Sequence, residues 1–332
     1  MKRYRPFLII LGVNVLALGV LVILNRILTL YLNPYYLQIL IYIGINIILA
    51  VSLNLINGQT GQFSIGHAGF MAIGAYASAS VTYYGGPVIS DFLINHFHFS
   101  EFLSKSFVFI LALALSGFLA AIAGFLIGLP VLRLRGDYLA IATLGFGEII
   151  RVVILNMDVV GGARGFTDIP GHTNFFWLGL CTFMTIFVIR NIVCSTKGLA
   201  FLAIREDEVA AESIGIHITK YKVGAFVIGA FFAGVAGCLF AHQVGYLHTN
   251  SFTFMKSIEV VVMVVLGGMG NIWGCVLAAI ALTILPEVLR FFSDFRMVLY
   301  SLILILLMLG RSKGFFGGLK LRFWNSRAEI KN

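Results

Sequence analysis

Long apolar stretches alternate with short polar connections along nearly the whole chain. These stretches, in which charged residues are few, occupy residues 7–24, 37–56, 62–83, 107–129, 138–155, 175–194, 222–243, 255–270, 272–290 and 296–310. A helix of about 20 apolar residues crosses the hydrocarbon core of a bilayer. The pattern therefore predicts an all-α, polytopic membrane protein of about ten transmembrane helices.

Four of these stretches predict spans less firmly than the rest. The third, fifth, eighth and ninth are rich in glycine or polar residues, or lie almost directly against their neighbours. A re-entrant segment within 62–83 or 255–290 therefore stays open. The first stretch, from Phe7 to Leu24, follows a basic start and resembles a signal peptide. It is long enough to span, and no small-residue cleavage site follows it, so an uncleaved first helix is favoured.

Composition and charge agree with a protein surrounded by lipid. Hydrophobic residues make up 60% of the 332 residues and charged residues 11%, whereas a soluble domain has about 25% charged residues. The net charge of +9 does not indicate a nucleic-acid partner, because lysine and arginine flank the apolar stretches. With ten spans, the basic clusters at 2–5, 133–135, 197–222 and 311–322 share one side. This side is predicted to be cytoplasmic, with both termini on it.

The opposite connections carry few basic residues. They hold Arg26, Lys105, Arg164 and Lys256, which agrees with an outer location. The loss of one span from the count would place a basic cluster outside, so the charge pattern also supports the number of spans.

No catalytic constellation is present in the sequence. The chain has no Gly-x-x-x-x-Gly-Lys-Ser/Thr loop to hold nucleotide phosphates, so we expect a non-enzymatic protein that binds no cofactor and does not hydrolyse ATP itself. The cysteines lie in or beside apolar stretches without metal-ligand spacing, which predicts buried small side chains rather than disulfides or a metal site. They are Cys181, Cys194, Cys238 and Cys275. The histidines at 67, 96, 98 and 242 are likewise predicted to be packing or interfacial residues.

Glycine recurs inside the spans at spacings that bring helices together. Gly124-x-x-x-Gly128 and Gly270-x-x-x-Gly274 are small-residue pairs of the kind that permits close backbone approach. Two Gly-x-x-Gly turns, at 58–61 and 267–270, each end an apolar stretch. Their similarity hints at an internal duplication.

One cytoplasmic connection, residues 195–222, is much longer than the others. The stretch from Arg205 to Ile214 is predicted to be helical, with acidic residues near its start and Gly215 as its stop. Such a helix is a docking element for a soluble partner or, equally, a solvated connector. Its candidate residues are Arg205, Glu206, Asp207, Glu208, Ala210, Ala211, Glu212 and Gly215.

Polar residues inside the spans mark a candidate pathway. The segment from Asn54 to His67 combines polar side chains with three glycines, which suits irregular backbone lining a cavity; part of it is alternatively a cytoplasmic turn. Glu148, Arg151 and Glu259 are ionisable groups at membrane depth. They either line a charged pathway or form helix-packing ion pairs, and packing is favoured. The polar candidates in the segment are Asn57, Gln59, Thr60, Gln62, Ser64 and His67.

Several motifs together resemble one transporter family. Glu208-Val-Ala-Ala-Glu-Ser-Ile-Gly215 is similar to the coupling loop of ABC-importer permeases, although Val209 stands where a glutamate usually precedes the two alanines. The branched-chain amino-acid permease family is resembled more specifically over about 37–310. The other motifs are Asn57-Gly-Gln-Thr-Gly-Gln-Phe-Ser-Ile-Gly-His-Ala-Gly-Phe70, Leu134-Arg-Gly-Asp-Tyr-Leu-Ala-Ile-Ala-Thr-Leu-Gly145, Gly161-Gly-Ala-Arg-Gly-Phe166 and Gly267-Gly-Met-Gly-Asn-Ile-Trp-Gly274.

The resemblance implies a transport subunit of M type in a bacterial cytoplasmic (inner) membrane. Its partners would be a second related permease, two cytoplasmic ATP-binding subunits and a periplasmic substrate-binding protein. The loop at 195–222 would couple ATP hydrolysis to transport, and the outer connection 156–174 would face the binding protein, unless it is a simple turn stiffened by Pro170. The cargo would be leucine, isoleucine or valine. Urea, short amides or a sugar are alternatives, and an ion-driven secondary transporter is a rival of another class.

The same resemblance divides the chain into three parts. Residues 1–36 would form an N-terminal helix and outer loop, 37–310 the permease domain, and 311–332 a basic cytoplasmic tail.

Overall fold

The computed structural model describes residues 19, 21, 24–28, 30–97, 100–132, 134, 136–292 and 295–310. Within this part of the chain the regular structure is helical and contains no β-strand, apart from one isolated bridge between Phe166 and Leu247. The predicted all-α class is therefore confirmed. Most of the expected first span and the whole expected tail at 311–332 lie outside the described residues.

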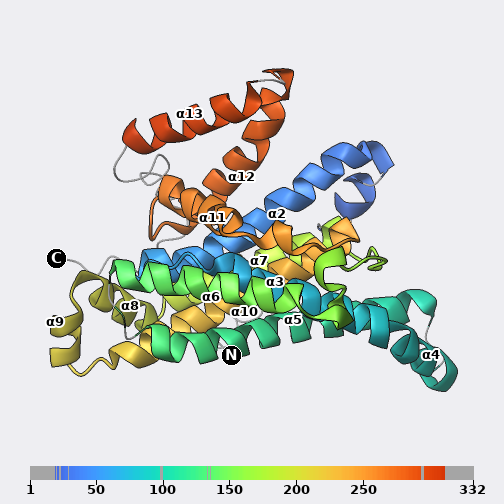
Figure 1. Cartoon of the computed structure of the whole chain (residues 1–332), viewed down its shortest axis with the longest axis horizontal. Coiled ribbons are helices and arrows are strands. Elements are labelled where there is room, and N and C mark those ends of the chain that lie inside the picture. Colours follow the sequence, from blue (N-terminus) through green and yellow to red (C-terminus); the bar gives the residue numbers. More distant parts are fainter. Residues whose placement is uncertain are drawn as a thin grey trace, which may run out of the picture.

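Among the described residues, seven helices are long and apolar enough to cross a membrane; their arrangement is seen in Figure 1. Three of them include a flanking turn of tighter or wider helix: the π-helical turn η1 (Leu55–Gln59) ends the first, the 3₁₀ turn η5 (Thr249–Phe252) begins the sixth, and part of the 3₁₀ turn η6 (Leu289–Phe292) ends the last. The seven are α2 with η1 (Pro34–Gln59), α5 (Glu101–Val131), α6 (Asp137–Leu155), α7 (Phe175–Val193), α10 (Ile218–Val244), η5 with α11 (Thr249–Gly267) and α12 with its last turn (Ile272–Phe291).

The remaining helices of the described chain are shorter or more polar. They are α3 (His67–Ser80), which continues through the π-helical turn η2 (Val81–Gly85), α4 (Gly86–Phe97), α8 (Thr196–Glu206), α9 (Glu208–Ser213) and α13 (Arg296–Gly310). The expected spans at 62–83 and 296–310 thus correspond to helices outside the seven. Helix α3 can be poor in large apolar residues because protein, not lipid, surrounds most of it.

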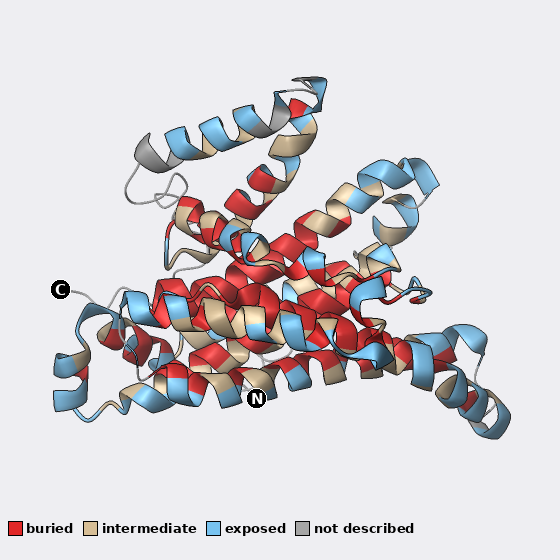
Figure 2. Cartoon of the chain, in the orientation of Figure 1, coloured by how far each residue is buried: buried red, intermediate tan, exposed pale blue. Residues whose placement is uncertain are grey.

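The interior of the fold is built around α2, α3 and α10. In their most apolar stretches, most residues of α2 and α10 are buried, whereas fewer than a third of those of α5, α6 and α7 are. Figure 2 shows this difference as a continuous buried centre flanked by helices with one exposed face. A helix that is apolar all round is expected either in such a centre or in lipid.

Helix α5 shows how the sequence separates a protein face from a lipid face. Its large exposed side chains recur every three or four residues along one stripe. The opposite stripe consists of small buried residues four apart: Ala112, Ser116, Ala120, Gly124 and Gly128. In lipid, association depends on close packing rather than on the hydrophobic effect, so the small stripe is the one that contacts α10.

Close backbone contacts join α3, α5 and α10. A methyl group at Gly74 would lie 2.2 Å from the carbonyl oxygen of Gly234, and one at Gly124 would lie 2.6 Å from the Ala230 Cβ. The small pair at Gly124 and Gly128 therefore packs as predicted. Gly270 lies in the turn before α12 with φ +89°, so the interpretation of Gly270 and Gly274 as a helix-face pair is wrong: Gly274 packs on the carbonyl of Gly267.

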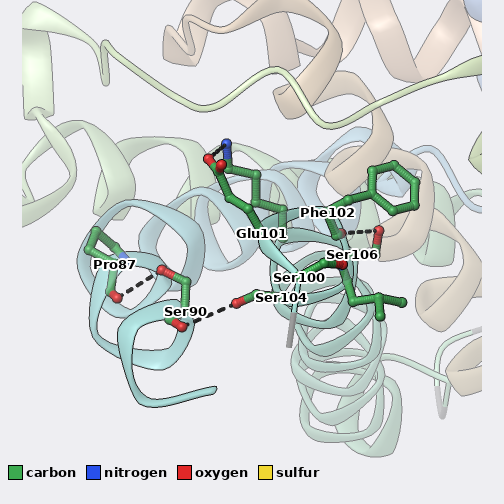
Figure 3. A network of polar contacts seen from close by, with 9 residues as sticks. Pro87, Ser90, Ser100, Glu101, Phe102, Ser104 and Ser106 are labelled. Atoms are coloured by element: carbon green, nitrogen blue, oxygen red, sulfur yellow. Dashed lines mark hydrogen bonds and ion pairs between the residues drawn. The ribbon is translucent and has the colours of Figure 1, made fainter. Parts of the chain in front are cut away.

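Helices α4 and α5 form a hairpin at one end of the molecule (Figure 3). The Ser90 hydroxyl donates to the Pro87 carbonyl, and the Ser104 hydroxyl of α5 donates to the Ser90 carbonyl at 3.3 Å. Ser100 caps α5 through its side chain. Serine hydroxyls thus satisfy backbone groups where the chain reverses. Helices α8 and α9 lie at the opposite end of the long axis (Figure 1).

Substitution of Gly74 by alanine is expected to destabilise the fold, because the added methyl group meets the backbone of α10. Overpacking of this kind costs about 1–3 kcal/mol. The midpoint of thermal unfolding in detergent should therefore fall. Gly224→Ala in α10 is the matched control, since a methyl group there meets no atom within 4 Å and alanine is the better helix former. Equal midpoints for the two variants would contradict the proposed close contact.

Candidate functional site

The 195–222 connection folds into two helices rather than the one predicted. Helix α8 ends at Glu206, and Asp207 takes an extended conformation between it and α9. The Asp207 carboxylate accepts hydrogen bonds from the backbone nitrogens of Val209 at 2.8 Å and Ala210 at 3.1 Å. An aspartate at this position caps a new helix more effectively than it continues an old one. The predicted start was therefore wrong, whereas the stop at Gly215, with φ +86°, is confirmed.

One face of α9 is fixed to the membrane helices and the other is open. The Ala211 side chain is buried, and the Glu208 carboxylate forms an ion pair with Lys222 at the start of α10. The Lys222 side chain is only 6% exposed. The exposed surface of α8 and α9 carries Leu199, Val209 and Ile214 together with the acidic Glu206, Asp207 and Glu212. A surface of this kind can contact a soluble partner through its apolar residues and attract basic groups through its acidic ones.

The polar segment after α2 lies inside the protein. The Asn57 amide exchanges two hydrogen bonds with the Ser64 backbone, both at 3.2 Å, and the Thr60 hydroxyl donates to the Ile56 carbonyl. The His67 imidazole lies 2.8 Å from the Ser52 hydroxyl. Ser52 lies about two helical turns, or about 10 Å, before the end of η1. Because His67 contacts Ser52, the chain after η1 has turned back into the bundle by about this distance when α3 begins.

The six predicted polar residues of this segment are all buried. Asn57, Gln59, Thr60, Gln62, Ser64 and His67 expose 5% or less of their surface. A solvated cytoplasmic turn would expose them, so the interior interpretation is favoured. Several of their atoms have no hydrogen-bond partner within the described residues: both amide atoms of Gln62, the Ser64 hydroxyl and Nδ1 of His67. A buried polar atom without a partner costs about 1–3 kcal/mol, so this arrangement favours rearrangement or hydration.

The predicted ionisable groups form two ion pairs. Glu148 pairs with Arg151 at 2.7 Å on α6, and Glu259 pairs with Lys256 at 3.0 Å on α11. Lys256, expected in an outer connection, instead lies in α11 and donates to the Asn46 side chain at 3.1 Å. Asn46 is near the middle of α2, so this lysine lies beside the middle of that helix, with 22% of its side chain exposed. The sequence signal that could have placed it is its three-residue spacing from Glu259.

A small hollow lies where the polar segment, α6 and α11 meet. Its walls include Ala68 and Gly69 of α3, Glu148 of α6 and Ser257 of α11, and its volume is about 10 Å³. Such a space holds about one water molecule. Beside it, an apolar groove of about 380 Å³ lies between α3 and α6, lined mostly by isoleucine and valine. The structure thus brings Glu148 beside Ile65 of the polar segment, whereas none of the six predicted polar residues is among the walls of the hollow. Glu259 is also absent from these walls and pairs with Lys256 instead.

Most of the histidines and cysteines that were predicted to pack do contact neighbours in the described chain, whereas His67 keeps an unpartnered Nδ1 in the polar segment. The His242 ring contacts Thr82 through Nε2 and packs edge-on against Phe109, and His96 stacks on Phe92. Cys238 and Cys275 are buried, but Cys194 is exposed, because it follows the end of α7. His98 lies outside the described residues.

Tight glycine turns shape the connection 156–174, which the sequence predicts to be an outer one. Gly161 and Gly165 have φ values of +84° and +83°, and a side chain at either would collide with nearby atoms. The bridge from Phe166 to Leu247 ties this connection to the segment after α10. Burial, with a smaller contribution from Lys105, lowers the pKa of His172 below its usual value. The connection is therefore a structured surface rather than a loose loop.

Comparison with known proteins places this architecture in a family. A family model described as "Branched-chain amino acid transport system / permease component" matches residues 35–310. The chain belongs to this permease family. No solved structure matches the permease.

Individual relatives agree with this membership. The permease is 38% identical to the high-affinity branched-chain amino acid transport system permease protein LivM of Escherichia coli (strain K12), over 81% of this chain and 67% of LivM. It is 26% identical to the probable branched-chain amino acid transport permease protein LivM of Methanocaldococcus jannaschii, over 77% and 81% of the two chains. A shorter match, 33% identity over 30% of each chain, is to an autoinducer 2 import system permease protein, LsrC, of Enterobacter sp. (strain 638).

Removal of the Glu208 carboxylate is expected to loosen α9, because Lys222 then loses its ion-pair partner in a buried position. Glu208 is 30% exposed, so the cost lies between that of a surface pair and a buried one, about 1–2 kcal/mol. Hydrogen exchange over 208–216 should become about tenfold faster in Glu208→Ala. Glu212→Ala, an exposed position on the same helix, is the control, and equal exchange in both variants would argue against the ion pair as the anchor of α9.

Proposed function

We propose that this permease is a membrane subunit of an ABC importer that takes up leucine, isoleucine and valine. The observation that carries the proposal is the 38% identity to LivM over 81% of the chain. ATP would be hydrolysed by separate cytoplasmic subunits, and the chain would reside in the bacterial cytoplasmic membrane. A binding protein would deliver the amino acid from outside, and the permease would pass it inward without covalent change.

Helices α8 and α9 are the proposed docking site for the ATP-binding subunits. Two features support this assignment: the open face of α9 is apolar and acidic, and its opposite face is anchored by Ala211 and by the Glu208–Lys222 ion pair. A force applied to the open face therefore passes into α10 rather than bending a loose loop. The exposed Glu206, Asp207 and Glu212 would meet basic groups of the partner.

The polar segment and Glu148 are the proposed inner part of the pathway. Glu148 and Ile65 of this segment border the hollow between α3, α6 and α11, whose volume of about 10 Å³ is far too small for an amino acid. Transport therefore requires these three helices to move apart. Unpartnered polar atoms of Gln62, Ser64 and His67 would gain partners from water or cargo as they do so. The Glu259–Lys256 pair of α11 is not among the walls of this hollow.

The exposed face of α6 is the proposed contact with the second permease. Glu148 and Arg151 are 32% and 24% exposed in the single chain, and charged groups facing lipid cost several kcal/mol. A second permease that covers this face would remove the charges from lipid and enclose the neighbouring groove. The outer connection 156–174, rigid at its glycine turns, is the proposed contact with the binding protein.

Uptake of labelled leucine tests the proposed function. Cells that carry the permease with its second permease, ATP-binding subunits and binding protein should accumulate leucine, isoleucine or valine, and should lose this uptake when the ATP-binding subunits are deleted. Urea and a sugar serve as alternative cargoes.

Two results would contradict the proposal. Uptake of urea or sugar but not of leucine would reject the assigned cargo. Uptake that survives deletion of the ATP-binding subunits but is abolished by Glu148→Gln would favour a secondary transporter driven by an ion gradient.

Photo-cross-linking tests the assigned face of α6. A photoreactive residue at Val152, which is 46% exposed on α6, should cross-link to the second permease, because this face is proposed to be covered. The same residue at Phe125, 47% exposed on the lipid stripe of α5, is the matched control and should give no protein adduct. Cross-linking at Phe125 but not at Val152 would place the subunit contact on α5 instead.

A further inference from the structure

Three segments that are distant in sequence meet at the Arg205 side chain. The Arg205 guanidinium, at the end of α8, donates through Nη1 to the carbonyl oxygen of Gly58 in η1 at 3.1 Å. The turn between α11 and α12 adjoins the same place, because a methyl group at Gly270 would lie 3.0 Å from that nitrogen. Arg205 therefore points inward from the docking helices, toward the ends of α2 and α11.

Glycines make this convergence possible. A methyl group at Gly58 would lie 2.3 Å from the backbone nitrogen of Gly270, and one at Gly61 would lie 2.9 Å from the Arg205 Cγ. Gly61 and Gly270 also have φ values of +69° and +89°, which other residues adopt with strain. The two Gly-x-x-Gly turns of the sequence thus face each other across one contact.

Side-chain hydrogen bonds join the two turns directly. The Gln59 amide donates to the Gly270 carbonyl at 2.7 Å, and the Gly270 nitrogen donates to the Asn54 side chain at 2.8 Å. Displacement of either turn therefore displaces the other. Gly58 lies in a π-helical turn, a widened geometry that recurs at functional sites.

Both walls of the small hollow continue from this contact. The remaining part of the polar segment, 60–67, follows η1 directly. The Ser257 hydroxyl of α11 accepts a hydrogen bond from the backbone nitrogen of Ala68 at the start of α3. A movement of the joined turns therefore reaches the polar segment from one side and α11 from the other. Glu206 holds the outer part of the same guanidinium, with Nη2 to Oε1 at 2.8 Å.

We infer that Arg205 is the residue that transmits movement of the docking helices to the two glycine turns, and through them to the inner pathway. The inference rests on the proposed function, because it assigns the route by which the bound ATP-binding subunits act. Arg205 is a positioning residue rather than a docking contact: its inward hydrogen bond leads away from the open face that would hold the partner.

The ratio of ATP hydrolysed to leucine transported tests this role in the complete transporter reconstituted in proteoliposomes. In Arg205→Met, the ATP-binding subunits should still co-purify and hydrolyse ATP within about twofold of the unmodified complex. Leucine uptake should fall at least tenfold, so that the ratio rises. Arg205→Lys, which retains the charge and can still reach one carbonyl, should restore part of the uptake. Lys197→Met, an exposed position on the same helix, should leave the ratio unchanged.

Spin labels provide a readout that does not depend on the cargo. Labels at Thr196 of α8 and Met269 of the α11–α12 turn, both exposed, should keep a constant distance when ATP binds, because the two elements move together. In Arg205→Met the distance should change on ATP binding.

The outcomes separate the inference from the proposed function. Absence of leucine uptake by the unmodified complex would reject the proposed function. The role of Arg205 would then be tested by the spin-label distances alone. Loss of folding or of the ATP-binding subunits in Arg205→Met would assign a structural or docking role and overturn the inference. An unchanged ratio or an unchanged distance in that variant would overturn it as well.

Discussion

Helix α10 lies closer to α3 and α5 than ordinary side chains would permit, and the rest of the bundle is arranged around that contact. Glycine and other small residues at Gly74, Gly124 and Gly234 bring backbone against backbone. In a bilayer, lipid tails are as apolar as leucine, so helices gain little by merely burying apolar surface against each other. The shape of the small stripes therefore decides which helices form the interior and which faces remain for lipid.

In an interior packed this tightly, a buried polar group without a hydrogen-bond partner is costly, so each one needs a partner or a functional role. Most do: Asn46, Lys256 and Glu259 form one network across α2 and α11, and Glu148 is paired with Arg151. The segment at 60–67 is different, since several of its buried polar atoms lack partners within the described residues. It begins next to the glycine turns that receive Arg205. The segment 60–67, with its unpartnered polar atoms, is thus adjacent to the place where Arg205 of the proposed docking helices contacts the core.

The helical class and seven of the membrane helices follow from the sequence because lipid imposes length and hydropathy on each span separately. The break in the docking loop was missed, since Asp207 reads as an ordinary first-turn acid until the chain is seen to reverse there and use it as a cap. The expected span at 62–83, which was held less firmly than most, lies in the structure as helix α3, a helix of 14 residues that neighbouring helices enclose. Helix α3 is not among the seven membrane-compatible helices of the described chain.

The sequence by itself determined the class of protein, the position of the long connection at 195–222 and the polar character of 54–67, because each of these is a property of a continuous segment. Only the tertiary structure decided that Lys256 lies against Asn46, and that Arg205 reaches the glycine turns at Gly58 and Gly270. These contacts join residues from about 65 to more than 200 positions apart. Helical periodicity fixes which side chains share a face of one helix, but packing between helices fixes which faces meet.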